Sequence, residues 1–350
     1  DATDGKPQLG DFGVDLTAMD MSVKPGDDFY RYVNGKWMDR TEIPADRSSW
    51  GGFAILRDLS DKRTREVIEE SATKQNAPGS VGEKIGVTYA SFMDAPAIEA
   101  AGAKPLAPYL AKIDAIKTKG DLARAFGDAT MHGIDVPVGA GVQQDLKDNT
   151  KYTVYMGQGG LGLPDRDYYL TDNPKFVEAR QKYVTHIAKM LQLAGRPDAQ
   201  AAAQRIYDLE KQIAAVHWTR AEQRQIEKIY NPVATADLAA KMPGFDWTAM
   251  LTEQRLAGQP QVIVAQPSAL TSTAKIVDAT PLSTWKEYLA YHTISNAAPL
   301  LSTAFTDENF AFYGTTLSGT PELKARWKRG VDLVNGSLGE AVGQIYVQKY

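Results

Sequence analysis

Apolar residues recur every three or four positions along most of the chain, which is the spacing of one face of an α-helix. Ser80 and Glu83 form a possible capping box before one such stripe, which consists of Ile85, Tyr89, Phe92 and Met93. Asn173 and Pro174 stand where an N-cap and a first helical residue belong, and Gly195 is placed to end the helix that follows. The pattern therefore predicts a chain dominated by amphipathic helices.

Two further helices and a few strands complete the predicted elements. A long helical pattern covers about 198–228, and another runs from Thr284 to about Leu301, which brings the expected total to about nine to eleven helices. Alternating apolar residues in 136–142 and 152–156, separated by a polar turn, predict a β-hairpin, and 262–265 is typical of one short strand. The expected fold class is mainly α, a multi-helix lobe with a small β-hairpin.

The last stretch of the sequence carries a helical apolar stripe with no stop signal after it. The stripe consists of Val331, Val334, Leu338, Val342 and Ile345. No Gly, Asn or Pro follows Ile345 before Tyr350, and such a stripe needs a partner to cover it. We therefore expect the protein to continue beyond Tyr350, and the 350 residues alone to be poorly soluble because the stripe is uncovered.

Composition narrows the class of protein. The 350 residues are 43% apolar and 23% charged, which excludes wholesale disorder. The formal net charge of −4 argues against a nucleic-acid binder, which would carry a basic stripe for phosphates. No apolar run reaches the length of a membrane-spanning helix.

Cysteine is absent, so disulfides, thiolate zinc sites and cysteine nucleophiles are all excluded. The sequence starts at Asp1 rather than Met and continues with a polar stretch to about Gly13. A removed export signal would leave such a start. We therefore expect an exported protein, located in the periplasm or secreted.

A zinc site without cysteine must use histidine and carboxylates, and a helical pair needs two histidines at positions i and i+4. The four histidines are His132, His186, His217 and His292, and none has a histidine partner within one helical turn. The interpretation is four structural or surface imidazoles, and no metal site is expected in this segment.

Other chemical motifs are equally weak. The glycines between Gly157 and Gly162 lack the Lys-Ser/Thr of a phosphate-binding loop, so a loop with positive φ angles is the better interpretation. No Gly-x-Ser-x-Gly elbow is present, and the carboxylate pairs fit solvated faces. The Trp and Tyr residues fit a core better than a ligand groove. Judged from the residues alone, the segment contains no catalytic residues.

Three stretches are nevertheless too particular to be generic. Residues 27–37, continuing to Ile43-Pro44, resemble the opening signature of the neprilysin and endothelin-converting-enzyme family of zinc metallopeptidases. Residues 160–169, Gly-Leu-Gly-Leu-Pro-Asp-Arg-Asp-Tyr-Tyr, resemble the central loop signature of that family. Residues 313–316, 327–329 and 334–346 are similar to the segment that leads toward its catalytic half.

The resemblance implies the N-terminal lobe of a two-lobed, gluzincin-type zinc metalloendopeptidase. In that arrangement a flexible segment (1–20) precedes a helical domain (21–350) that roofs the cavity for oligopeptide substrates. The partner of this lobe would be the protein's own C-terminal catalytic domain. Zinc in the complete enzyme would be bound by H-E-x-x-H and a downstream Glu, all outside this chain, so the 350 residues alone should bind no zinc and hydrolyse no peptide.

The same resemblance suggests two substrate-binding residues. Phe53 matches a family Phe that walls the apolar S1′ pocket, and Arg57 matches an Arg near S2′. Ser49 and Ala54 stand where the family has an Arg and an Asp that grip a substrate's terminal carboxylate, which puts that clamp in doubt. Arg47 lies two residues away and is a possible substitute.

A different class of function remains open at this point. An all-helical, exported module rich in Tyr and Trp could capture peptides or glycans without catalysing a reaction. The residues that follow Tyr350 separate the two hypotheses, because only the peptidase requires a zinc-binding motif there.

Overall fold

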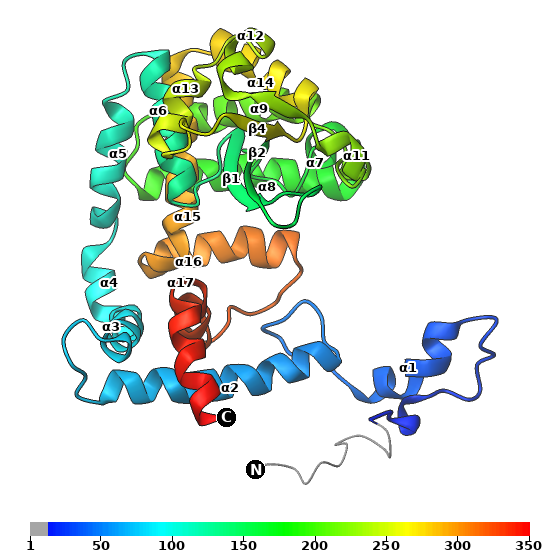
Figure 1. The fold of residues 1–350 in the computed structure, drawn as a ribbon. Helices are drawn as coiled ribbons and strands as arrows, with labels where there is room; N and C mark the ends of the chain where they lie inside the picture. Colours follow the sequence, from blue (N-terminus) through cyan, green and yellow to red (C-terminus); the bar gives the residue numbers. More distant parts are fainter. Residues whose placement is uncertain (1–12) are drawn as a thin grey trace. The chain divides into compact units, whose positions relative to one another are not determined.

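A computed structural model describes residues 13–350, and these residues are mainly helical with one four-stranded sheet, which confirms the predicted fold class (Figure 1). The chain divides into two compact units, Asp1–Ala90 with Gly319–Tyr350, and Ser91–Ser318. The described residues form seventeen α-helices, more than the nine to eleven expected, because several are single turns that periodicity does not resolve. None of the described helices is long and apolar enough to cross a membrane.

The unit Ser91–Ser318 contains most of the helices. They are α4 (Ala95–Ala101), α5 (Ala107–Asp114), α6 (Lys119–Met131), α7 (Asp167–Leu170), α8 (Pro174–Leu193), α9 (Ala199–Val216), α10 (Arg220–Gln223), α11 (Ile226–Ile229), α12 (Leu238–Lys241), α13 (Trp247–Glu253), α14 (Pro267–Ala279), α15 (Leu282–Ala297) and α16 (Thr303–Asn309). A π-helical segment, Phe310–Leu317, follows α16.

The sheet of this unit has the strand order β1-β2-β4-β3. The predicted hairpin is confirmed as β1 (Val138–Gln144) and β2 (Tyr152–Gln158), antiparallel with Val142 opposite Val154. The predicted strand at 262–265 is confirmed as β4 (Gln261–Val264), which runs parallel to β2. The sequence did not reveal β3 (Pro232–Ala234), a three-residue edge strand that starts with proline.

The helix signals at 173–195 are confirmed in detail. Asn173 accepts a hydrogen bond from the Lys175 amide at 3.0 Å, Pro174 opens α8, and Gly195 adopts a φ of 68° just past its end. The predicted helix over about 198–228 is wrong in its second half, because α9 ends at Val216. Thr219 and Glu222 form a capping box that starts α10 instead, so the chain breaks between the two helices.

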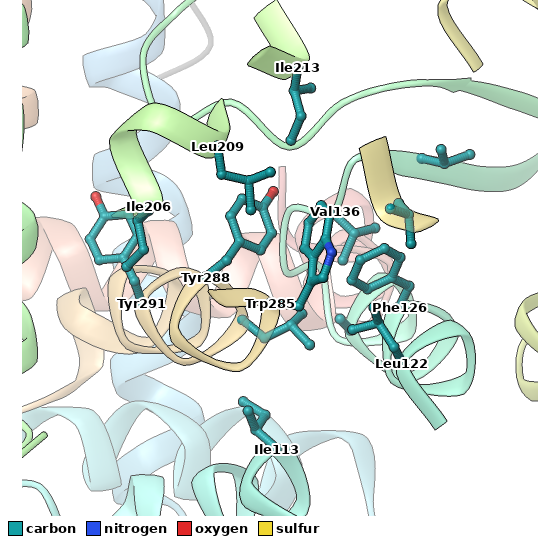
Figure 2. Packing of buried hydrophobic residues seen from close by; sticks show 14 of the residues in the cluster. Ile113, Leu122, Phe126, Val136, Ile206, Leu209, Ile213, Trp285, Tyr288 and Tyr291 are labelled. Carbon is teal, nitrogen blue, oxygen red and sulfur yellow. The ribbon is translucent and has the colours of Figure 1, made fainter. Parts of the chain in front are cut away.

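Large aromatic side chains fill the core of this unit. Trp285 and Tyr288 on α15 are fully buried, and Figure 2 shows Trp285 beside Phe126 of α6. The two rings meet edge to face with centroids 5.4 Å apart. Ile206, Leu209 and Ile213 of α9 are buried in the same cluster. Two of the six Trp and six of the sixteen Tyr are buried, so packing accounts for only part of the aromatic content.

The other unit is built on α1 (Phe29–Arg40), α2 (Gly52–Thr73), most of α3 (Val81–Met93) and α17 (Arg326–Lys349). Ser80 accepts a hydrogen bond from the Glu83 amide at 3.2 Å, as the predicted helix start requires. Gly86 of α3 lets the two helices approach, because a Cβ there would lie 2.6 Å from the Ser71 carbonyl oxygen of α2.

The apolar stripe of the last helix has a partner inside this unit. Helix α17 packs along α2, and Val331, Val334 and Val342 are buried (Figure 1). Leu338 has non-helical φ and ψ angles that kink α17, and it is only partly buried. The expectation that the stripe stands uncovered is therefore wrong, because α2 covers it.

The first part of this unit contrasts with the rest. From residue 13 to residue 63 only Gly35 is buried, and the apolar side chains of α1 lie largely in solvent, including Phe29 and Tyr30. Asp28 caps α1 by accepting from the Arg31 amide at 2.8 Å. The expected flexible segment 1–20 falls mostly on residues 1–12, which lie outside the described residues.

Candidate functional site

The start of α2 carries both residues singled out from the sequence. Phe53 and Arg57 lie four positions apart on the helix, so their side chains share one face. Residue Phe53 is 92% exposed, and the side chain of Arg57 is 61% exposed. A phenylalanine so exposed on an ordered helix is available for contact with another molecule or another part of the protein.

The face that carries Phe53 and Arg57 continues as the buried face of the same helix. Thr64, Val67 and Ile68 follow at helical spacing, and all three are buried. Leu56 lies on the exposed part of this face and is 61% exposed. One apolar face is thus covered along its C-terminal half and open along its N-terminal half.

Arg57 is held by acidic side chains from two helices. Its Nη2 lies 3.3 Å from Oδ1 of Asp332 on α17, and its Nε lies 3.9 Å from Oδ2 of Asp61, one turn further along α2. Lys324 binds the other oxygen of Asp332 at 2.9 Å. Burial raises the pKa of Asp61, and the nearby Arg57 charge offsets part of that rise. These four side chains form a cluster of two cations and two acids, called here the Arg57 cluster.

The partners of Arg57 could not be found from the sequence. Asp332 is separated from Arg57 by 275 positions and carries no motif of its own. Only the pairing of α2 with α17 brings the two side chains together. Asp61, in contrast, follows the i, i+4 rule on one helix and could have been proposed.

Arg47 is engaged elsewhere. Its guanidinium is bonded to the Asp58 carboxylate and lies 5.4 Å from the ring centroid of Trp50, and its side chain is only 12% exposed. Ser49, at the position of the family's clamp arginine, is exposed. A substrate carboxylate that approached Arg47 would therefore compete with Asp58 for its guanidinium.

The second signature, residues 160–169, forms a loop built into the core of the other unit. Gly160 has a φ of 79°, which confirms the predicted positive φ in this loop. A Cβ on Gly160 would overlap the hydroxyl of Tyr288, and one on Gly162 would overlap that of Tyr183. The glycines are therefore needed for close packing.

A buried carboxylate, Glu210 of α9, ties this loop to three helices. It accepts hydrogen bonds from the hydroxyls of Tyr169 at 2.6 Å and Tyr183 at 2.9 Å, and His292 Nε2 lies 2.8 Å away. The Gly162 amide lies 3.3 Å from the same carboxylate. Burial, reinforced by the Glu210 charge, raises the pKa of both tyrosines well above the ordinary value. The loop signature thus serves a structural network.

The third signature begins beside the core, where Phe312 is buried and Tyr313 is packed against it. Tyr313 lies in the π-helical segment and its hydroxyl is 3.2 Å from that of Tyr291. Phe312 stacks on His186 with centroids 4.8 Å apart. Burial raises the pKa of Tyr313 to about 12.

The histidines do not form a zinc site. His186 pairs with Glu308 at 3.0 Å, and His292 with Glu210. His132 contacts the Asp128 carbonyl at 2.8 Å, and burial lowers the pKa of His217 to about 4. Across residues 13–350, no three His, Asp or Glu side chains gather closely enough to hold a metal. The donor set present here does not fit zinc.

A family model described as Peptidase family M13 matches residues 25–350. Rat endothelin-converting enzyme 1 is 26% identical over 349 residues, which cover 95% of this chain and 45% of the relative. Neprilysin-3 of Drosophila melanogaster is also 26% identical, over 359 residues with the same coverage of 95% and 45%.

The crystal structure of the Mycobacterium tuberculosis zinc metalloprotease Zmp1 with an inhibitor has a TM-score of 0.92 and 36% identity to this chain. The match covers 97% of this chain and 52% of that structure. The chain thus spans about half the length of the relatives it matches. The family match over residues 25–350, together with this structural agreement, shows that the chain belongs to peptidase family M13 and corresponds to its N-terminal part.

Proposed function

We propose that this chain is the N-terminal helical half of a zinc metalloendopeptidase that hydrolyses oligopeptides. The observation that carries the proposal is the likeness to the inhibitor-bound zinc metalloprotease, which extends over 97% of this chain at 36% identity. The zinc ligands would come from residues outside the 350, since the histidines described here are engaged in other contacts. The protein would act in the periplasm or outside a bacterial cell.

Phe53 and Arg57 would supply part of the primed-side substrate site. The exposed Phe53 ring can pack against an apolar P1′ side chain, and burying such a side chain stabilises a complex by about 1.5–3 kcal/mol. Arg57 can donate a hydrogen bond to a substrate carbonyl one turn further along the helix. Both residues act in this proposal by positioning the peptide.

Other exposed surfaces of the unit that contains α1, α2 and α17 are suited to contact a catalytic half. In such a contact this helical part would form the roof of the substrate cavity. Apolar side chains of α1 and of the start of α2 are exposed, although both stretches are helical. Gly336, Gly339 and Gly343 recur at three- and four-residue spacing on α17, and no atom outside the local backbone of this helix lies within 4 Å of where their Cβ atoms would be. Small residues on a helix face permit close approach of another element. Residues 21–350 would then act as one functional domain behind a leading segment, 1–20.

The experiment compares the complete protein with residues 1–350 alone. The complete protein should retain about one zinc per chain after dialysis and hydrolyse oligopeptides, whereas residues 1–350 should do neither. A complete protein without zinc and without peptidase activity would contradict the proposal, and so would hydrolysis by residues 1–350. The alternative of a non-catalytic peptide- or glycan-binding module is less well supported, because the family that matches residues 25–350 is a peptidase family.

A further inference from the structure

Arg57 is an exposed arginine whose charge is already balanced. Asp332 lies at its Nη2 and Asp61 at its Nε, so two acids flank one side of the guanidinium. A guanidinium offers five N–H donors, and its bidentate grip on a carboxylate uses two of them in parallel. Asp61 and Asp332 thus occupy the edge of the guanidinium that contains Nε and Nη2.

We propose that Asp332 is a specificity-determining residue, which directs Arg57 toward the backbone carbonyls of internal peptide segments and away from free C-terminal carboxylates. An incoming carboxylate would have to displace Asp332 or lie beside two like charges, which is unfavourable. A neutral carbonyl needs only one donor and suffers no such repulsion. This inference rests on the proposed function, because it assigns a substrate class to the same site.

Lys324 provides the opposing charge in the Arg57 cluster. It binds Oδ2 of Asp332 at 2.9 Å, while Arg57 faces Oδ1 at 3.3 Å. The formal charges of the two cations and the two acids of this cluster sum to zero. Removing the Asp332 charge leaves an excess cation next to the substrate, and removing Lys324 leaves an excess anion. The two changes should therefore move the preference for a terminal carboxylate in opposite directions.

The experiment uses the complete zinc peptidase and pairs of short peptides that differ only in a C-terminal acid or amide. The measured quantity is the acid-to-amide ratio of kcat/KM. In wild type the acid and the amide peptide should have kcat/KM values that differ by less than about threefold. Asp332→Asn should raise the ratio about tenfold, the size expected for one partly screened charge at close range. Lys324→Met should lower the ratio at least threefold.

Asp39→Asn is the matched control, because Asp39 is an exposed acid that pairs with Arg31 on α1 and takes no part in the Arg57 cluster. Its ratio should equal that of wild type. A wild type that prefers the acid by more than tenfold would overturn the inference, and so would an Asp332→Asn ratio within twofold of wild type. If Asp332→Asn does not fold, the test rests on Lys324→Met. An acid-to-amide ratio in Lys324→Met equal to that of wild type would then overturn the inference.

Arg57→Ala separates this inference from the proposed function. It should lower kcat/KM about ten- to a hundredfold for both members of each pair, which corresponds to the loss of one charge-assisted hydrogen bond. No effect of Arg57→Ala would refute the substrate-binding role of Arg57 itself. A second outcome is that Arg57→Ala lowers kcat/KM, while Asp332→Asn and Lys324→Met leave the acid-to-amide ratio unchanged. That outcome would refute only the role of Asp332.

Discussion

Two stretches resemble the peptidase family in sequence, but one is buried in the structure and the other is exposed to solvent. The loop at 160–169 is enclosed, with Tyr169 fully buried and glycines packed against tyrosine hydroxyls. The start of α2 is open, with Phe53 92% exposed. A recognisable motif can therefore be required for packing inside the chain or for contact outside it. Burial, rather than the motif itself, separates these two uses.

The largest expected effect tests the enclosed stretch. Glu210→Ala should lower the free energy of unfolding by about 3–5 kcal/mol, since two tyrosine hydroxyls and His292 lose their buried acceptor. Urea unfolding of the chain, followed by the fluorescence of the buried tryptophans, measures the change. Glu178→Ala on exposed α8 surface is the control and should cost less than about 0.5 kcal/mol. A loss below about 1 kcal/mol for Glu210→Ala would show that the network is not structural.

Local signals in the sequence predicted much of this enclosed region. The caps of α8, the hairpin and the positive φ of Gly160 all follow from residue types at fixed offsets. The Glu210 network could not be predicted, because it joins α9, α8, α15 and the loop through side chains far apart in sequence. The end of α9 was missed although Thr219 and Glu222 carried the capping signal for it.

A smaller effect is the dependence of stability on pH through His217, which lies beside the start of the enclosed loop. His217 follows α9, and burial lowers its pKa to about 4, partly opposed by a hydrogen bond to Gly159. The unfolded chain, with a histidine pKa of about 6.5, binds a proton as the pH falls, whereas the folded chain does not until about pH 4. The free energy of unfolding should therefore decrease as the pH is lowered from about 6.5 to about 4.

The measurement is the free energy of unfolding at pH 7 and pH 5. His217 should account for a loss of about 2 kcal/mol between the two values. The variant His217→Gln should lose correspondingly less, because it has no imidazole to protonate. An equal loss in wild type and variant would mean that His217 stays accessible to protons in the folded chain.

The open stretch was less predictable from its own residues. Helical spacing places Phe53 and Arg57 on one face, but the same face is buried at Val67 and Ile68. Nothing in the local pattern says which half is covered, since α17 lies far away in sequence. The proposed role of Phe53 and Arg57 rests on the resemblance, whereas the engagement of Arg47 with Asp58 emerged only from the structure.

The exposed start of α2 is proposed here to contact substrate. The most direct test of this claim is the kcat/KM of the complete peptidase for two peptides with Phe or Ala at P1′. Phe53→Ala should reduce the preference for Phe about tenfold, as expected for lost apolar contact, while changing unfolding by less than about 0.5 kcal/mol. Phe29→Ala, an exposed phenylalanine on α1, should leave the preference unchanged. An unaltered preference in Phe53→Ala, or an equal loss for both peptides, would contradict the claim.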